Sequence, residues 1–213
     1  MTSIKGYADL LASGMVGELN EQQTSFLEVI RRNLGRMSDL VRDLSEINHL
    51  ESGRVQFEKR PFNFQEVVDE VVDSWSERLK SREQTLVLDV PADLPTAYAD
   101  PKRVGQVLSN LVSNANKYTM DGGTVTITIH PAADFLHVAV RDTGIGITEE
   151  DQAKLFTQFF RAPDQDVRDQ VGWGLGLSIV KSMVEAQGGE IMFESVHGEG
   201  STFTFTVPLA EEK

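Results

Sequence analysis

Cysteine is absent from the chain of 213 residues, which excludes disulfide bonds, thiolate metal sites and a cysteine nucleophile. Positive charge is scarce, because 20 lysine and arginine residues stand against 33 aspartate and glutamate residues, for a net charge of −13. This balance disfavours nucleic acid and anionic membrane surfaces as partners. The sequence has no apolar run long enough for a transmembrane helix and no signal peptide. We therefore expect a soluble, cytoplasmic chain without direct membrane contact, although segments outside it could anchor a full protein.

The first quarter of the sequence is expected to be helical. Residues 2–12 place apolar side chains on one face of a helix, and Asn20 with Gln23 gives a capping-box pattern before a second helix that runs to about residue 50. Apolar residues of this second helix recur in steps of four and three at Ile30, Leu34, Met37, Val41 and Leu44. Residues 1–52 are predicted to form a helical hairpin that pairs with a second copy in a four-helix bundle. Packing of this seam against the rest of the chain is the alternative.

The rest of the chain, residues 53–213, has the pattern of an α/β domain. Asp100 and Pro101 suit the start of a helix over 101–118, and Gly122–Gly123 suits a turn before two alternating strands. The other expected elements are a short strand at 55–59, a helix near 64–81, a strand at 85–90, a helix after Gly176 and two closing strands. The predicted fold class is α+β: a helical hairpin followed by an α/β two-layer sandwich with a mixed sheet.

Two glycine clusters stand at element ends. Asp142-Thr-Gly144-Ile-Gly146 follows an alternating apolar strand, and Gly172-Trp-Gly174-Leu-Gly176 leads into an apolar-periodic helix. Glycine allows close backbone approach, and a glycine loop that enters a helix offers N–H groups to an anion. Each cluster alone is a weak signal and is also compatible with an ordinary turn.

The helix over 101–118 carries Asn110 and Asn114 four residues apart, with Lys117 and Tyr118 one turn further. Amides on a mostly apolar helix need partners, and an amide oxygen is a suitable ligand for magnesium. Lys117 could then serve phosphates as a point charge and Tyr118 as an aromatic wall. From this helix alone a magnesium and phosphate site and a structural asparagine pair remain open.

Taken together, five motifs resemble the ordered box set of sensor histidine kinases, and the resemblance covers essentially the whole chain. The opening TSIKGYADLL resembles the segment just after the phospho-acceptor box, and the long helix resembles the second helix of the dimerisation hairpin. The motifs are Asn110-xxx-Asn114-Ala-x-Lys117-Tyr118, Asp142-Thr-Gly144-Ile-Gly146, Phe156-xx-Phe159-Phe160-Arg161, Gly172-x-Gly174-Leu-Gly176 and Gly198-x-Gly200-Ser-Thr-Phe.

The resemblance implies an ATP-binding domain of the histidine kinase and gyrase type (the Bergerat or GHKL fold) over residues 53–213. Asp142 would accept a hydrogen bond from the adenine amino group, and Asn114 would hold Mg²⁺ with Asn110 close to the same ion. A lid would span about residues 156–173, with Phe156 and Phe159 as its anchors. The other residues implied at the nucleotide are Lys117, Tyr118, Gly144, Gly146, Ile147, Arg161, Gly172, Gly174, Leu175, Gly176 and Thr202.

The resemblance also implies a protein histidine kinase of a two-component system. In the full protein the γ-phosphate of ATP would pass to a histidine and then to an aspartate of a response-regulator receiver domain. The family's acceptor histidine box is missing, and none of His49, His130, His137 and His197 replaces it. We therefore expect a chain cut within the first hairpin helix, which binds ATP, does not autophosphorylate and dimerises weakly.

One departure from the family pattern and one alternative function stay open. Trp173 stands where the family has a small or hydroxylated residue, which leaves the contact between lid and phosphates open there. A nucleotide-controlled binding switch or an anti-sigma-type serine kinase on the same fold is the alternative function, and the long hairpin of residues 1–52 argues against the serine kinase.

Overall fold

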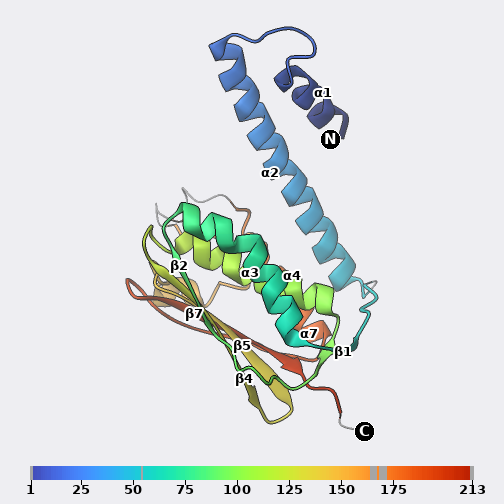
Figure 1. Cartoon of the computed structure of the whole chain (residues 1–213), viewed down its shortest axis with the longest axis vertical. Coiled ribbons are helices and arrows are strands. Elements are labelled where there is room, and N and C mark those ends of the chain that lie inside the picture. Colours follow the sequence, from blue (N-terminus) through green and yellow to red (C-terminus); the bar gives the residue numbers. More distant parts are fainter. Residues whose placement is uncertain (1, 54, 164–166, 168–171, 212–213) are drawn as a thin grey trace. The chain divides into compact units, whose positions relative to one another are not determined.

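The computed structural model describes residues 2–53, 55–163, 167 and 172–211. The chain divides into two compact units, Met1–Asn48 and His49–Lys213 (Figure 1). The first unit is helical and the second contains the β-sheets, in agreement with the predicted fold class.

The first unit is a hairpin of α1 (Thr2–Ala12) and α2 (Glu21–Glu51), of which the last residues of α2 belong to the second unit. The predicted capping box is present: the Asn20 N–H donates to Gln23 Oε1 at 2.9 Å, and the Gln23 N–H donates to Asn20 Oδ1 at 2.9 Å. An ion pair joins Asp9 and Arg31 at 2.9 Å, and a small apolar cluster holds the two helices together. This cluster consists of Ala8, Leu27 and Leu34, with Leu19 packed against it.

The apolar seam of α2 is largely uncovered within the helical unit. Leu34 is buried, but Met37 and Val41 are 52% and 56% exposed. Ile30 and Leu44 are also exposed. An exposed apolar stripe along a helix indicates an interaction surface, because single exposed residues are ordinary whereas contiguous rows are not.

The second unit contains a five-stranded mixed sheet covered on one face by helices α3, α4 and α7 (Figure 1). Its strand order is β2-β4-β5-β7-β6; β2 and β4 are parallel and the other three pairs are antiparallel. β1 and β3 form a separate antiparallel pair. The elements are β1 (Arg60–Phe62), α3 (Phe64–Ser81), β2 (Thr85–Asp89), β3 (Ala97–Ala99), α4 (Pro101–Tyr118), β4 (Thr124–Ala132), β5 (Phe135–Asp142), α5 (Glu149–Gln152), α7 (Gly176–Ala186), β6 (Ile191–Val196) and β7 (Gly200–Pro208).

Alternation along the central strands places one set of side chains against the helices. Leu136, Val138 and Val140 of β5 are buried, whereas the residues between them are partly exposed. The matching buried residues of the neighbouring strands are Val125, Ile127, Ile129, Phe203, Phe205 and Val207. The core therefore lies between the sheet and the helix layer.

Residues 55–59 were expected to form a strand, but they have no regular structure in the part of the chain that is described, and β1 begins at Arg60. β3 was not predicted. Both strands are only three residues long and pair with each other, so neither carries the four to eight alternating residues that make a strand visible in sequence.

Asp100 fixes the start of α4. Its Oδ1 accepts hydrogen bonds from the N–H groups of Lys102 and Arg103 at 3.1 and 3.3 Å, as an N-cap does. Its Oδ2 accepts from the Glu58 N–H at 3.1 Å, and its own N–H donates to Gln187 Oε1 at 2.8 Å. One residue thus joins α4, the chain before β1 and the end of α7.

Candidate functional site

Asp142 ends β5, and the pKa of its carboxyl group is raised above the ordinary value. Its side chain is on the helix-facing side of the sheet and is 6% exposed. Oδ1 accepts a hydrogen bond from the Gly144 N–H at 2.9 Å. Burial raises the pKa of Asp142, and backbone hydrogen bonds from Gly144 and Ser201 partly oppose this rise. A buried carboxylate with acceptor capacity is suited to bind a hydrogen-bond donor.

The first glycine cluster packs backbone against backbone beside Asp142. A Cβ atom on Gly144 would lie 2.3 Å from the Tyr118 carbonyl oxygen. Gly146 has a φ of +63°, and its Cβ would lie 2.0 Å from the Val196 carbonyl oxygen. Neither position has space for a side chain, so glycine is required at both for steric reasons.

Asn110 and Asn114 are both half-buried on α4, and neither side chain donates or accepts a hydrogen bond with any residue that the structure describes. Asn116, two residues further, differs: its Nδ2 donates to Gln84 Oε1 at 2.6 Å. A structural hydrogen-bonding role therefore fits the side chain of Asn116 rather than those of Asn110 and Asn114. Two amide oxygens one turn apart without protein partners fit a hard cation such as Mg²⁺.

Tyr118 links α4 to the glycine loop and to the segment after α5. Its carbonyl oxygen accepts from the Ile145 N–H at 3.2 Å. Burial raises the pKa of the Tyr118 hydroxyl, and the positive charge of Arg161 acts in the opposite direction, so Arg161 lies close enough to interact with it. The Arg161 guanidinium also donates to the Val167 carbonyl. Lys117 is half-buried beside Tyr118. The structure therefore gathers two cations near the end of α4.

The second glycine cluster is built around Gly174. This residue has a φ of +71°, its Cβ would lie 2.4 Å from the Phe160 carbonyl oxygen, and its own carbonyl accepts from the Phe159 N–H at 3.0 Å. Leu175 is buried before α7. Gly172 and Gly176 have no described atom within 4 Å of their built Cβ positions, so no steric reason for glycine is found at them.

The expected lid over residues 156–173 lies partly outside the described residues, because 164–166 and 168–171 are not among them. Of its two expected anchors, Phe156 packs edge-on against Phe193 with ring centroids 5.9 Å apart. Phe159 is 56% exposed with a φ of +63°, so it does not anchor the segment as expected. Trp173 is also exposed.

Thr202 is the one expected site residue that the sheet turns away from Asp142. In the register of β5 and β7, Thr202 pairs with Arg141, whereas Ser201 pairs with Asp142. Because successive side chains point to opposite faces, Ser201 shares the helix-facing side with Asp142 and Thr202 does not. Ser201 is buried, and its Oγ lies 2.9 Å from Ser195 Oγ. Ser201 stands two and four residues before the buried Phe203 and Phe205, and this spacing is the sequence signal that its side chain points to the buried face.

Ile147 is half-buried at the end of the first glycine cluster, and its carbonyl accepts from Gln152 Nε2 at 3.0 Å. Gln152 Nε2 also donates to the Ser195 carbonyl at 3.1 Å, and the Gly198 N–H donates to the Ile145 carbonyl at 2.7 Å. These bonds tie the segment that follows Asp142 to the end of β6.

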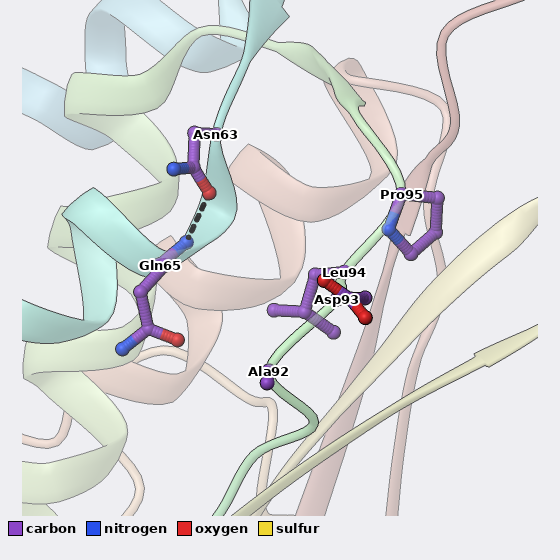
Figure 2. A pocket seen from close by; sticks show the side chains of 6 residues that line it. All are labelled: Asn63, Gln65, Ala92, Asp93, Leu94 and Pro95. Atoms are coloured by element: carbon purple, nitrogen blue, oxygen red, sulfur yellow. Dashed lines mark hydrogen bonds between the residues drawn. The ribbon is translucent and has the colours of Figure 1, made fainter.

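A hollow of about 480 Å³ lies elsewhere, between the start of α3 and the segment after β2 (Figure 2). Asn63 faces it while capping α3, with its Oδ1 accepting from the Gln65 N–H at 3.0 Å. The hollow is lined by Asn63, Gln65, Ala92, Asp93, Leu94 and Pro95. The start of α3 meets the start of α4, since the Gly105 Cβ position lies 3.6 Å from Val67. The hollow is therefore at the opposite end of α4 from Asn114 and Tyr118.

Family models match both parts of the chain. Residues 1–53 match the His Kinase A (phospho-acceptor) domain, and residues 99–211 match the histidine kinase-, DNA gyrase B- and HSP90-like ATPase. The chain belongs to the histidine kinase family. The resemblance drawn from the five motifs is thereby confirmed.

The individual proteins and solved structures that resemble the chain are also histidine kinases. The chain is 36% identical to the circadian input-output histidine kinase CikA of Synechococcus elongatus over 98% of its length, and 34% identical to the sensor histidine kinase WalK of Bacillus subtilis over 100%. The chain spans 28% of the length of CikA and 35% of the length of WalK.

The crystal structure of full-length ShkA in complex with AMPPNP matches 99% of the chain and 44% of ShkA, with a TM-score of 0.82 and 26% identity. Acinetobacter baumannii AdeS matches 99% of the chain and 95% of its own, with a TM-score of 0.72 and 25% identity.

Within its described residues, this histidine kinase chain has no helix that combines the length and the apolar character of a membrane span.

Proposed function

We propose that the chain is the ATP-binding kinase core of a two-component sensor histidine kinase. Asp142 carries the proposal: a buried carboxylate, steered by the Gly144 N–H, lies beside a loop that only glycine can form at Gly144 and Gly146. Such a carboxylate can accept a hydrogen bond from the amino group of adenine, whereas guanine presents a carbonyl oxygen at the same position. The site would thus select ATP over GTP.

The phosphate end of the nucleotide is proposed to lie along the end of α4. Asn114, with Asn110, would hold Mg²⁺ through amide oxygens, and the ion would neutralise phosphate charge when bound. Lys117, Tyr118 and Arg161 would face the phosphates. The residues that lead into α7 and begin it would supply N–H groups, because α7 begins without a side-chain cap in its described residues. These residues are Gly172, Gly174, Leu175 and Gly176. We place Ser201 at the adenine side instead of Thr202, and Ile147 against the base.

In the full protein, the γ-phosphate would pass to a histidine of a dimerisation hairpin and then to an aspartate of a response-regulator receiver domain. The exposed seam of α2 supports pairing of two hairpins, because four of its five apolar residues are exposed in the helical unit. None of the four histidines follows the family's acceptor pattern. We therefore expect the chain to bind ATP without phosphorylating itself.

Incubation with γ-labelled ATP and Mg²⁺, with ATP binding measured in parallel, tests this function. The expected result is saturable ATP binding, weaker GTP binding and no label on the protein. Acid-labile label on the chain would show that one of its own histidines accepts phosphate, and His49 on α2 would be examined first. Absence of any nucleotide binding by the folded chain would reject the proposed function.

Replacing Asn114 with alanine is expected to remove most of the contribution of Mg²⁺ to nucleotide binding. Loss of one metal ligand should weaken ATP binding about tenfold in saturating Mg²⁺ and leave the affinity without Mg²⁺ unchanged. Titration calorimetry over a series of Mg²⁺ concentrations measures both values. Asn116→Ala is the matched control: it removes the bond to Gln84 and should lower stability with the Mg²⁺ dependence intact. Equal Mg²⁺ dependence in Asn114→Ala and the parent chain would exclude Asn114 as a ligand.

A further inference from the structure

Two of the four histidines lie directly opposite each other on neighbouring strands. His130 of β4 and His137 of β5 are register partners, so their side chains point to the same face of the sheet. This is the face away from the helices, because the adjacent Ile129, Leu136 and Val138 are buried on the helix side. The two imidazole rings are stacked, with centroids 5.1 Å apart and planes inclined by 20°. His130 is exposed and His137 is partly exposed.

We propose that His130 and His137 form a binding site for one divalent transition-metal ion, with Cu²⁺ bound more tightly than Ni²⁺ or Zn²⁺. Imidazole nitrogen is a preferred ligand of these three ions, and their affinities for a given nitrogen site peak at Cu²⁺. Metal–nitrogen bonds of about 2.0–2.1 Å require the two nitrogen atoms to lie about 3 Å apart. Near-parallel rings 5.1 Å apart reach this separation by small rotations of the side chains, because the ring torsion of histidine is broad.

Strand pairing fixes the backbone positions of His130 and His137 before a metal ion binds. At His137, β5 is paired with β4 and with β7. At His130, β4 is paired with β5, whereas its pairing with β2 ends at Thr128. When one imidazole has bound a metal, the second is presented at high effective concentration. Fixing the two ligands therefore requires little further ordering of the backbone.

Water would complete the coordination shell. Among the described residues, no group of three or more histidine, aspartate or glutamate side chains gathers to hold a metal. A two-nitrogen site with solvent ligands excludes Mg²⁺ and Ca²⁺, which take oxygen ligands. It is also separate from the Asp142 site: His137 and Asp142 share β5 but stand five residues apart on opposite faces of the sheet. The inference is therefore independent of the proposed nucleotide binding.

Calorimetric titration of the full chain with Cu²⁺, and separately with Zn²⁺, tests the site. Nucleotide is omitted, because phosphates chelate metals, and excess Mg²⁺ is present to fill oxygen sites. The expected result is one ion per chain, with an affinity that falls at least tenfold in His130→Phe and in His137→Phe. Phenylalanine keeps the aromatic stack and removes both nitrogens, so it separates metal ligation from ring packing. His197→Phe, in the exposed turn after β6, is the matched control and should bind as the parent chain does.

Two results would overturn the proposal: no binding of Cu²⁺ by the folded parent chain, or equal binding by the parent and the two phenylalanine variants. A second measurement does not depend on the variants folding. Substoichiometric Cu²⁺, which is paramagnetic, should broaden the imidazole proton signals of His130 and His137 and leave those of His49 and His197 sharp. Broadening confined to His49 or His197 would place the metal elsewhere and reject the pair.

Discussion

Replacing Asp142 with asparagine is expected to weaken ATP binding about 100-fold and to make the folded chain more stable. The Gly144 N–H binds Oδ1 of Asp142, so in the variant the amide oxygen should occupy that position and the amide NH₂ group the other. A donor would then face the amino group of adenine, which is also a donor. Loss of a charged hydrogen bond and an unsatisfied donor together cost about 2–3 kcal/mol of binding free energy.

The gain in stability follows from the direction of the pKa shift. Burial raises the pKa of Asp142 in the folded chain above its ordinary value of 3.8. A group that holds its proton more tightly when folded adds stability at pH values below its ordinary pKa, and this stability is lost as the pH rises through the raised pKa. At neutral pH the fold therefore contains an ionised carboxylate at a net cost. Asparagine removes the charge, and a gain of about 1 kcal/mol is typical for such functional positions.

Calorimetry with ATP and GTP, together with urea unfolding, measures both effects. The variant should lose its preference for ATP over GTP, because the NH₂ group can donate to the carbonyl oxygen of guanine. In the parent chain, ATP binding should weaken as the pH falls through the raised pKa of Asp142. Asp134→Asn, on the exposed turn between β4 and β5, is the control and should change neither property. Unchanged ATP affinity in Asp142→Asn would remove Asp142 from the site.

Replacing Gly146 with alanine is expected to destabilise the second unit by about 3 kcal/mol or more and to abolish nucleotide binding. The left-handed backbone conformation at φ +63° costs about 1–2 kcal/mol for a residue with a Cβ atom. The Cβ would also lie 2.0 Å from the Val196 carbonyl oxygen, so the loop after Asp142 must move away from the end of β6. Such a movement would displace Ile145, whose N–H and carbonyl bind Tyr118 and Gly198.

Gly198→Ala separates the two contributions. Gly198 has a φ of +87°, but no described atom lies within 4 Å of its built Cβ position. This control should lose only the conformational part, about 1–2 kcal/mol, in urea unfolding. If Gly146→Ala is no less stable than Gly198→Ala, the close packing of Gly146 on Val196 does not exist in solution.

The features that could be predicted from the sequence are those that depend on residues close together along the chain. The capping box of Asn20 and Gln23 and the cap formed by Asp100 are local signals, and the helices that they start were predicted within a residue or two. The central strands β4 and β5 were visible because each alternates over at least six residues. β1 and β3 were not visible as strands, because they are too short to carry such a pattern.

What the sequence left undecided at the site depends on residues far apart in the sequence. Three asparagines lie near the end of α4, and only the contact of Asn116 with Gln84, 32 positions away, separates the structural amide from the other two. Thr202 was chosen from its place in a motif, whereas the register of β7 against β5 decides which side chain faces Asp142. Phe159 was expected to anchor the lid, but its side chain is 56% exposed and its φ is +63°.

Asp100 shows how narrowly a fold can restrict sequence variation at a position that takes no part in chemistry. Its two oxygen atoms accept from three N–H groups of two separate segments. Serine and threonine have a single acceptor atom, asparagine would place an NH₂ group against an N–H, and glutamate would carry both oxygens one methylene too far. Among histidine kinases that share this arrangement, aspartate is therefore the residue expected here, and a different residue at the position would signal that the chain entering the domain follows another path.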